Sequence, residues 1–175
     1  MSSNPMTSPI IILGSSRSNG ATYKAIKNII ADHPETPIID LNAYNISPYD
    51  YEHSNKNDDF LLLMERIVGH NPIVLATPVY WYTMSAQMKT FIDRFSDLLA
   101  IAKDTGRKLR GKSVYVINTF SESIPEGFEA AFSQTCDYLG MKYLGCSYIN
   151  SDNLLEFQER NVEEIKKAVT NIFGL

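Results

Sequence analysis

Short apolar segments alternate along this chain with longer segments in which apolar residues recur every three or four positions. The short segments have the length and composition of buried β-strands. Five strands are predicted, over residues 10–13, 37–41, 73–76, 113–118 and 143–149.

The longer segments have the period of amphipathic helices, each with one apolar face. These faces consist of Thr22, Ile26, Ile29 and Ile30; Phe60, Leu63, Met64, Ile67 and Val68; Met88, Phe91, Ile92 and Phe95; Phe128, Ala131, Phe132 and Leu139; and Phe157, Val162, Ile165, Val169 and Ile172. The fourth helix is predicted to begin after Pro125. Residues 42–57 predict a long polar loop, and the basic run 103–112 predicts a solvated connection.

A helix after every strand predicts the α/β class, with a five-stranded parallel sheet covered by helices on both faces. Right-handed crossovers favour the strand order 2-1-3-4-5. In that order the first and third strands are neighbours at the switch point where such sheets bind ligands. No repeat or linker interrupts the pattern. Residues 9–175 are therefore predicted to form one domain, after a disordered tail of residues 1–8.

Composition and charge narrow the class of partner. The chain has 175 residues and a net charge of −4, which argues against nucleic acid or an acidic membrane surface. No apolar run approaches the ~20 residues that span a membrane. Cys136 and Cys146 have no metal or C-x-x-C spacing and are predicted to be core residues of a cytoplasmic protein. His33, His53 and His70 stand in separate connections, so surface positions and no metal site are predicted.

A polar loop follows the first strand and opens the first helix. Residues 14–22 read Gly-Ser-Ser-Arg-Ser-Asn-Gly-Ala-Thr. Their hydroxyl groups, the Arg17 guanidinium and the unpaired first amides of the helix suit a phosphate monoester. The loop lacks the Lys of a Walker motif and the second Gly of a dinucleotide fingerprint. A Ser/Gly turn with a helix cap is the structural alternative.

An aromatic loop follows the third strand. Residues 77–85 read Thr-Pro-Val-Tyr-Trp-Tyr-Thr-Met-Ser. Pro78 directs the chain out of the strand, and the amides that follow can hold a flavin ring and stabilise negative charge on it. The alternative is that these rings cap the core or form a subunit interface. Together the two loops predict an FMN site. Ser121, after the fourth strand, is a further candidate contact, with a helix cap as its alternative.

The same residues carry a resemblance to a known family. Residues 14–22, and residues 77–94 with the sequence Thr-Pro-Val-Tyr-Trp-Tyr-Thr-Met-Ser-Ala-Gln-Met-Lys-Thr-Phe-Ile-Asp-Arg, are similar to the flavodoxin-like NADPH-dependent FMN reductase family. The resemblance implies a flavodoxin-like three-layer sandwich, noncovalent FMN, and NAD(P)H-dependent reduction of flavins, quinones or similar small acceptors. It also implies a homodimer or homotetramer with the flavin near the subunit interface.

By position, the resemblance assigns two sets of cofactor contacts. The phosphate contacts are Ser15, Arg17, Ser18, Asn19, Gly20, Ala21 and Thr22, and the ring contacts are Pro78, Val79, Tyr80, Trp81, Tyr82 and Thr83. Residues 47–53 lack the cysteine cluster of related iron–sulfur flavoproteins, so no such cluster is expected.

The expected mechanism has two steps, in which NAD(P)H reduces the bound FMN and leaves, and an acceptor then takes its place. No catalytic acid or base is predicted among the side chains, because the cofactor supplies the chemistry. A non-enzymatic electron carrier of the flavodoxin type is the alternative. A response-regulator receiver is excluded, since it needs acidic residues after the first strand and an Asp after the third, where Gly14-Ser15 and Thr77 stand.

Overall fold

The computed structural model describes residues 8–152 and 156–174. Residues 1–7 of the predicted tail lie outside the described residues, and the tail stays a prediction.

Five parallel strands form one sheet in the order β2-β1-β3-β4-β5. They are β1 (Ile10–Leu13), β2 (Ile38–Asp40), β3 (Ile73–Pro78), β4 (Ser113–Phe120) and β5 (Lys142–Asn150). Ile11 of β1 pairs with Ile38 on one side and with Val74 on the other, so β1 and β3 are neighbours. The predicted strand order is confirmed, and the switch point lies where the sequence placed it.

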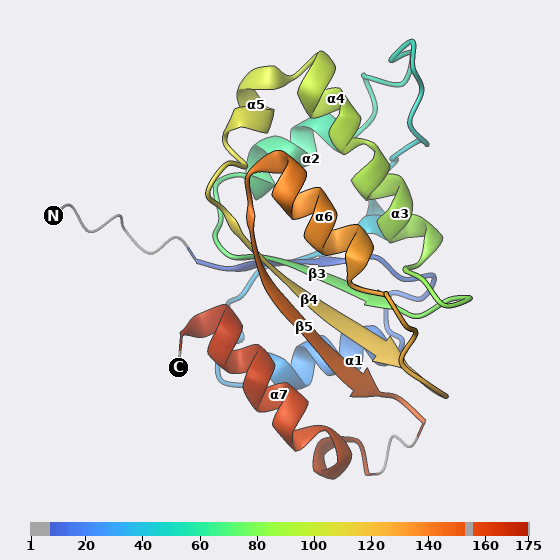
Figure 1. The fold of residues 1–175 in the computed structure, drawn as a ribbon, viewed down its shortest axis with the longest axis vertical. Helices are drawn as coiled ribbons and strands as arrows, with labels where there is room; N and C mark the ends of the chain where they lie inside the picture. The colour runs from blue at the N-terminus through green and yellow to red at the C-terminus, as the bar shows by residue number, and fades with distance from the viewer. Residues whose placement is uncertain (1–7, 153–155, 175) are drawn as a thin grey trace, which may run out of the picture.

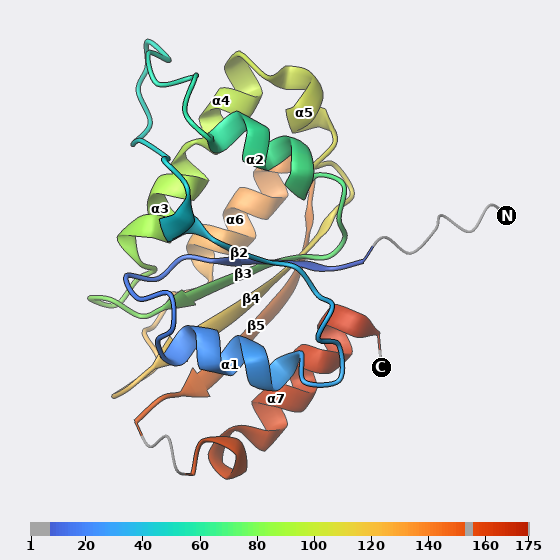
Figure 2. The same ribbon diagram turned by 180° about the vertical axis from the view of Figure 1, so that it is seen from behind.

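Helices cover both faces of this sheet (Figures 1 and 2). One face carries α1 (Ala21–Ile29) and α7 (Phe157–Phe173). The other face carries α2 (Phe60–Ile67), α3 (Ala86–Asp93), α4 (Phe95–Ala100), α5 (Lys103–Arg107) and α6 (Ala130–Leu139). A short 3₁₀ helix, η1 (Leu41–Ala43), follows β2. The three layers are those predicted for a doubly covered parallel sheet.

The core lies on both sides of the sheet, because successive side chains of a strand point to opposite faces. Ile10 and Ile12 of β1 pack on the side of α2, α3 and α6, whereas Ile11 and Leu13 pack on the side of α1 and α7. All four are fully buried. Because both faces of β1 are buried, its sequence is a continuous apolar run rather than an alternating one. Burial of each such side chain contributes about 1.5–3 kcal/mol to stability.

The structure differs from the prediction at three helices. The third predicted helix is divided at Arg94 into α3 and α4, and the basic run 103–112 contains the helix α5. A Cβ on Gly106 of α5 would lie 2.4 Å from the Leu98 carbonyl oxygen of α4, so only glycine allows this close approach. The helix α6 begins at Ala130 rather than after Pro125, because Gly127 has a left-handed φ of 71° that a right-handed helix excludes.

Side chains of α7 cover the outer edge of β5, the last strand of the sheet. Lys167 Nζ donates to the Cys146 carbonyl (2.7 Å), and Glu164 Oε2 accepts from the Tyr148 amide (2.9 Å). Asn161 Oδ1 accepts from the amide of Asn150, the last residue of the strand (2.8 Å). Backbone groups at this edge of the sheet are therefore satisfied within the chain.

Both cysteines are free and buried, as predicted. Burial raises the pKa of Cys136 to about 12, and it also raises the pKa of Cys146. Both thiols therefore stay protonated and unreactive at neutral pH.

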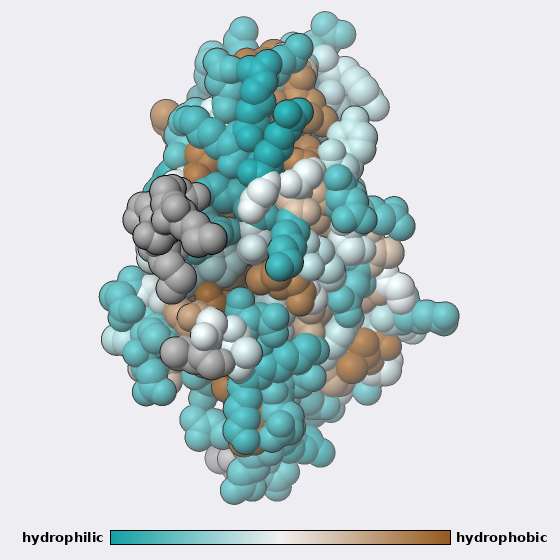
Figure 3. Space-filling view, turned by 60° about the vertical axis from the view of Figure 1, so that its left-hand side comes forward, coloured by the Kyte–Doolittle hydropathy of each residue, from teal (hydrophilic) through white to brown (hydrophobic). Residues whose placement is uncertain are grey.

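The surface on the side of the chain termini is mainly hydrophilic, with apolar residues in small separate patches (Figure 3). Among residues 8–152 and 156–174, no helix combines the length and the apolar character needed to cross a membrane.

Candidate functional site

Three loops meet at the carboxyl ends of β1, β3 and β4. They are the phosphate loop (residues 14–22), the aromatic loop (77–85) and the third loop (119–129). The Gly14 amide donates to the Ala76 carbonyl (2.9 Å), and the Val79 amide donates to the Thr119 carbonyl (2.8 Å). Backbone hydrogen bonds thus connect each loop to its neighbour at the predicted switch point.

The predicted phosphate contacts divide into an exposed and a buried set. Arg17, Ser18 and Asn19 are exposed, and Gly20 and Ala21 at the start of α1 are partly exposed. Ser15 and Thr22 are buried. The Thr22 hydroxyl lies 2.6 Å from the Thr119 hydroxyl, so its side chain fastens α1 to β4. The side chains free to meet a phosphate group are therefore those at the tip of the loop.

The first turn of α1 has no side-chain cap. Its N-cap is Gly20, no side chain accepts a hydrogen bond from the first amides, and the first turn holds no acidic residue. The helix α3 differs, since Ser85 Oγ accepts from the Met88 amide (3.2 Å). Uncapped amides and the positive end of the helix dipole favour an anion. The donor set of the phosphate loop fits the phosphate end of FMN. The helix cap of the alternative is Gly20, which has no side chain to occupy the first amides.

A tight turn forms the tip of the aromatic loop. The Tyr80 amide donates to the Thr83 carbonyl (2.9 Å), and the Thr83 amide donates to the Tyr80 carbonyl (3.2 Å). Between them Trp81 and Tyr82 have positive φ values of 47° and 66°, as in a type I′ turn. Trp81 is 92% exposed and Tyr82 is 72% exposed. These two rings do not cap the core, which excludes that alternative for them.

Tyr80 connects the aromatic loop to the phosphate loop. Its hydroxyl lies 2.5 Å from Ser16 Oγ. Burial acts to raise the pKa of Tyr80, but hydrogen bonds to Ser16 and Ser15 and the charge of Arg17 outweigh it, so the pKa is lowered. The phenol oxygen therefore lies among hydrogen-bond donors of the phosphate loop, with the charge of Arg17 nearby.

Ser85 fastens the other end of the aromatic loop to the phosphate loop. Its hydroxyl donates to the Gly14 carbonyl (2.7 Å), and its amide donates to Thr77 Oγ1 (3.0 Å). A Cβ on Gly14 would lie 2.8 Å from the Cβ of Met88, so glycine is required where α3 approaches this loop. Sequence reasoning assigned Ser85 no role. Its position one residue before the apolar spacing of α3 is the signal of an N-cap.

The third loop is fixed at both ends and exposed in the middle. Ser121 is exposed and does not cap α6, whose N-cap is Glu129, so the cap alternative for Ser121 is wrong. Glu129 accepts hydrogen bonds from the hydroxyls of Tyr143 (2.8 Å) and Tyr148 (2.9 Å), and burial raises the pKa of both phenols. Ser121 itself is exposed to solvent near the end of β4.

Asn118, the residue before Thr119 in β4, is fully buried. Its Nδ2 donates to the Thr77 carbonyl (3.3 Å), whereas its Oδ1 has no hydrogen-bond partner among the described residues. Buried acceptors are almost always paired. An unpaired acceptor beside the three loops is consistent with a ligand or water donor at this edge of the sheet.

A buried charged cluster lies away from the three loops, between the polar loop 42–59 and the start of α4. Arg94 is fully buried and donates to Asp58 (Nη1 to Oδ2, 2.5 Å) and to Asp97 (Nε to Oδ2, 2.7 Å). His53 Nδ1 lies 2.8 Å from Asp97 Oδ1, and the His53 side chain is only 18% exposed. The predicted surface position of His53 is therefore wrong. The signal that sequence reasoning missed is Arg94 itself, an arginine among the apolar positions of a helix.

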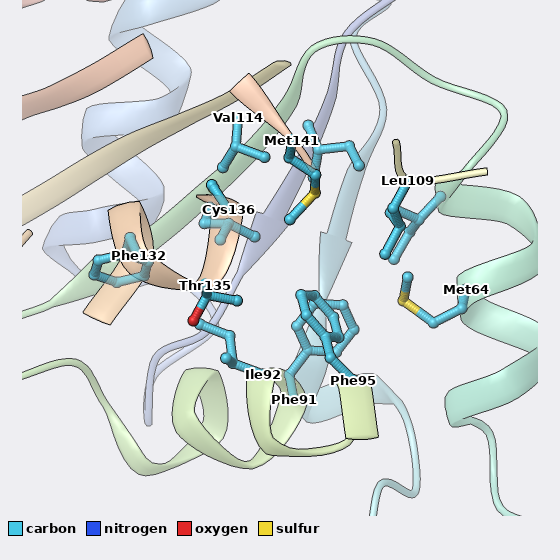
Figure 4. Close-up of a pocket in the computed structure, with 13 residues that line it drawn as sticks. Met64, Phe91, Ile92, Phe95, Leu109, Val114, Phe132, Thr135, Cys136 and Met141 are labelled. Atoms are coloured by element: carbon cyan, nitrogen blue, oxygen red, sulfur yellow. The ribbon is translucent and has the colours of Figure 1, made fainter. Parts of the chain in front are cut away.

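An enclosed apolar cavity lies between α2, α3, α6 and the sheet, not between the three loops (Figure 4). Phe91 and Phe95 face Cys136 and Met141 across it, and its free volume is about 20 Å³. That volume holds at most one water, and the apolar lining offers it no set of polar partners. It is a packing gap rather than a cofactor site. In the part of the chain that the structure describes, no three His, Cys, Asp or Glu residues are grouped to hold a metal ion.

Comparisons with known proteins agree with this geometry. The model of the NADPH-dependent FMN reductase family matches residues 9–155. One relative is YwqN of Bacillus subtilis (strain 168), which is named as an NAD(P)H-dependent FMN-containing oxidoreductase. It is 32% identical over an alignment of 154 residues, and the match covers 77% of this chain and 80% of the relative. The chain belongs to the NADPH-dependent FMN reductase family, whose cofactor is FMN.

Solved structures with low identity share the fold. The Trp repressor binding protein of Bacillus subtilis is 23% identical with a TM-score of 0.73, and the match covers 94% of this chain and 97% of that one. An FMN-dependent NADH-azoreductase of Bacillus anthracis, in complex with FMN, is 13% identical with a TM-score of 0.71, over 95% of this chain and 99% of that one. The predicted flavodoxin-like fold and family are confirmed.

Proposed function

We propose that this chain is an FMN-dependent enzyme that uses NAD(P)H to reduce flavins, quinones or similar small acceptors. Family membership gives the class of reaction. The acceptor class is part of the proposal. It is supported by an NADPH-quinone reductase of P. pentosaceus, 13% identical with a TM-score of 0.73 over 96% of this chain and 99% of that one.

The observation that carries the proposal is the connection of two loops of different chemistry by side-chain hydrogen bonds. The phosphate loop has exposed donors and an uncapped helix start, and the aromatic loop has exposed rings and backbone amides. The Tyr80–Ser16 contact holds them together. A phosphate end and a flat ring end side by side are what FMN requires.

The proposed holding residues follow from this arrangement. The phosphate group is assigned to Ser15, Arg17, Ser18, Asn19, Gly20, Ala21 and Thr22; the flavin ring is assigned to Pro78, Val79, Tyr80, Trp81, Tyr82, Thr83 and Ser121. Ser15 and Thr22 are buried. We therefore propose that they contact the phosphate group through backbone groups and position the loop, and do not offer exposed hydroxyls.

If held between these loops, FMN would supply the hydride-accepting and electron-donating chemistry that links NAD(P)H to the acceptor. This chain's residues bind and orient the cofactor, and no side chain is assigned the role of catalytic acid or base. Because one face between the loops serves both substrates in turn, a double-displacement mechanism is part of the proposal. A homodimer or homotetramer is also proposed, because the family resemblance implies one. A cytoplasmic location is proposed because both cysteines are free thiols.

The experiment compares this proposal with the electron-carrier alternative. The purified protein is loaded with FMN and mixed with NADPH or NADH under anaerobic conditions. Rapid bleaching of the flavin absorbance supports the enzyme, and bleaching only after addition of a separate reductase supports the carrier. Parallel double-reciprocal lines for nicotinamide and quinone support one shared face, whereas intersecting lines contradict it.

A further inference from the structure

Two large aromatic residues occupy the positions of the aromatic-loop turn that suit them least. The central residues of a type I′ turn need positive φ, and Asn-Gly or Gly-Gly is the usual solution. Here those residues are Trp81 and Tyr82, with φ values of 47° and 66°. Strain of this kind persists where a function requires it and the surroundings enforce it.

Folding does not account for these two side chains. Trp81 is 92% exposed and Tyr82 is 72% exposed, so neither ring gains stability from packing within the chain. An exposed Trp or Tyr at a strained position lowers the stability of the free chain. The rings therefore serve a contact outside this chain.

Hydrogen bonds fix the backbone that carries the two rings. Tyr80 and Thr83 exchange two backbone hydrogen bonds, and the Val79 amide donates to the Thr119 carbonyl. The Tyr80 hydroxyl is fixed on Ser16 of the phosphate loop. Aromatic residues on a fixed backbone make good contact surfaces, because only two side-chain torsions per residue lose freedom on binding.

The area of the two rings favours a small molecule over a second copy of the chain. A Trp and a Tyr together offer about 300–500 Å². A stable protein interface needs about 800 Å² from each partner. The residues around the turn are polar and exposed, among them Ser16, Arg17 and Thr83, so the apolar surface does not continue from the turn into the phosphate loop.

We propose that Trp81 and Tyr82, in addition to their proposed contact with the flavin ring, form a stacking platform that selects planar acceptors with two or more fused rings over single-ring or inorganic acceptors. The flat faces of Trp and Tyr stack on other aromatic rings in offset geometry. A fused ring system reaches past the shared face of the site onto this platform, whereas a benzoquinone does not. This inference rests on the proposed function, because it names the acceptor class of that same site.

The test replaces the rings by the residues that the turn itself prefers. Because both residues are also assigned to the flavin ring, the double variant Trp81→Asn/Tyr82→Gly is saturated with FMN and its bound FMN is measured. Rates per bound FMN are then compared for NADPH with each of three acceptors: 1,4-naphthoquinone, p-benzoquinone and ferricyanide. We expect kcat/KM for naphthoquinone to fall about tenfold relative to that for ferricyanide, as the loss of one stacking contact implies. The ratio for benzoquinone to ferricyanide is expected to change less than twofold. The thermal midpoint is expected to equal or exceed that of the parent, because the strain is relieved.

The control variant is Tyr138→Ala. Tyr138 is an equally exposed aromatic residue, at the far end of α6. It is expected to keep the parent's acceptor ratios.

Three outcomes would overturn the platform. An unchanged naphthoquinone-to-ferricyanide ratio in the double variant excludes stacking on these rings. A parent that sediments as a dimer and a double variant that sediments as a monomer would assign the rings to an interface between copies. A parent that is loaded with FMN but reduces no acceptor with NADPH would overturn the proposed function and the platform together, whereas parent turnover with an unchanged ratio overturns the platform alone.

Discussion

The hydroxyl groups of Thr22 and Thr119 lie 2.6 Å apart, although 97 positions separate the two residues in the chain. Thr22 belongs to the first turn of α1, and Thr119 belongs to the end of β4. Both are buried. Their hydrogen bond fixes the phosphate loop relative to the third loop, so the geometry of the site depends on residues that a ligand need not touch.

Replacing Thr119 by Val is expected to destabilise the protein, because the Thr22 hydroxyl then stays buried without this partner. The free energy of unfolding should fall by about 1–3 kcal/mol. The double variant Thr22→Val/Thr119→Val removes both hydroxyls and should recover part of this loss. Urea unfolding of the parent, both single variants and the double variant measures the coupling between the two residues. Strict additivity of the two single changes would show that the hydrogen bond contributes nothing.

Replacing Arg17 by Glu is expected to weaken FMN binding, because a carboxylate then faces the phosphate group. Loss of one charge-assisted contact costs about 1.5–3 kcal/mol, which is roughly ten- to a hundredfold in affinity. Riboflavin lacks the phosphate group and should bind both proteins about equally. Lys24→Glu, an exposed charge reversal within α1, is the matched control. Flavin fluorescence titration of the three proteins with FMN and with riboflavin measures these affinities, and equal FMN affinity in the parent and Arg17→Glu would place Arg17 outside the site.

Replacing Arg94 by Met is expected to destabilise the protein by about 3–5 kcal/mol, because Asp58 and Asp97 would then be buried without their cation. Arg94 also lies 4.8 Å from the centre of the Phe60 ring, a contact that Met does not replace. Lys89→Met breaks the half-exposed pair with Asp93 and should cost less than about 1 kcal/mol. Thermal and urea unfolding compare the two variants. Similar losses in both would contradict a structural role of the buried cluster.

Acid is expected to weaken the buried cluster through Asp58. Burial acts to raise the pKa of this carboxyl group, but hydrogen bonds from Arg94, Ser47 and Phe60 and the charge of Arg94 lower it below the ordinary 3.8. A carboxyl group with a lowered folded pKa stabilises the fold fully above its unfolded pKa. It loses that contribution as the pH falls through the folded value.

The measurement is the free energy of unfolding between about pH 7 and pH 2. The parent should lose stability mainly below the ordinary carboxyl pKa. Asp58→Asn should be less stable than the parent at neutral pH and should show a shallower decline in acid. Asp104→Asn changes a carboxylate that is 94% exposed and should follow the parent curve. A parallel decline in the parent and Asp58→Asn would rule out this carboxylate as the acid-sensitive group.

The sheet could be predicted because its strands are continuous apolar runs, such as Ile10–Leu13, separated by segments of helical period. The division at Arg94 could not, because the apolar spacing of Phe91 and Phe95 continues through it to Leu98. At the break, the Arg94 side chain pairs with Asp97 and with Asp58, which lies in a distant loop. The spacing of apolar residues shows which face of a helix is buried, but it does not show which charged residues pair across the fold.

The site was predictable in its location but not in its internal connections. Loop sequence and strand order together placed the phosphate and aromatic loops at the switch point. The hydrogen bonds of Tyr80 to Ser16 and of Ser85 to Gly14 depend on side-chain directions that only the folded chain determines. The positive φ values of Trp81 and Tyr82 were equally unforeseen, since bulky aromatic residues predict the opposite conformation.

The cover that α7 places over β5 limits how copies of this chain can associate. Lys167, Glu164 and Asn161 already occupy backbone groups along that border. An incoming strand would have to displace charged side chains before it found a free amide or carbonyl, which protects this border against domain-swapped and fibrillar growth. An oligomer that does not form through this edge of the sheet must use helix surfaces or the loops at the switch point. In such an oligomer, no strand of another copy pairs with β5.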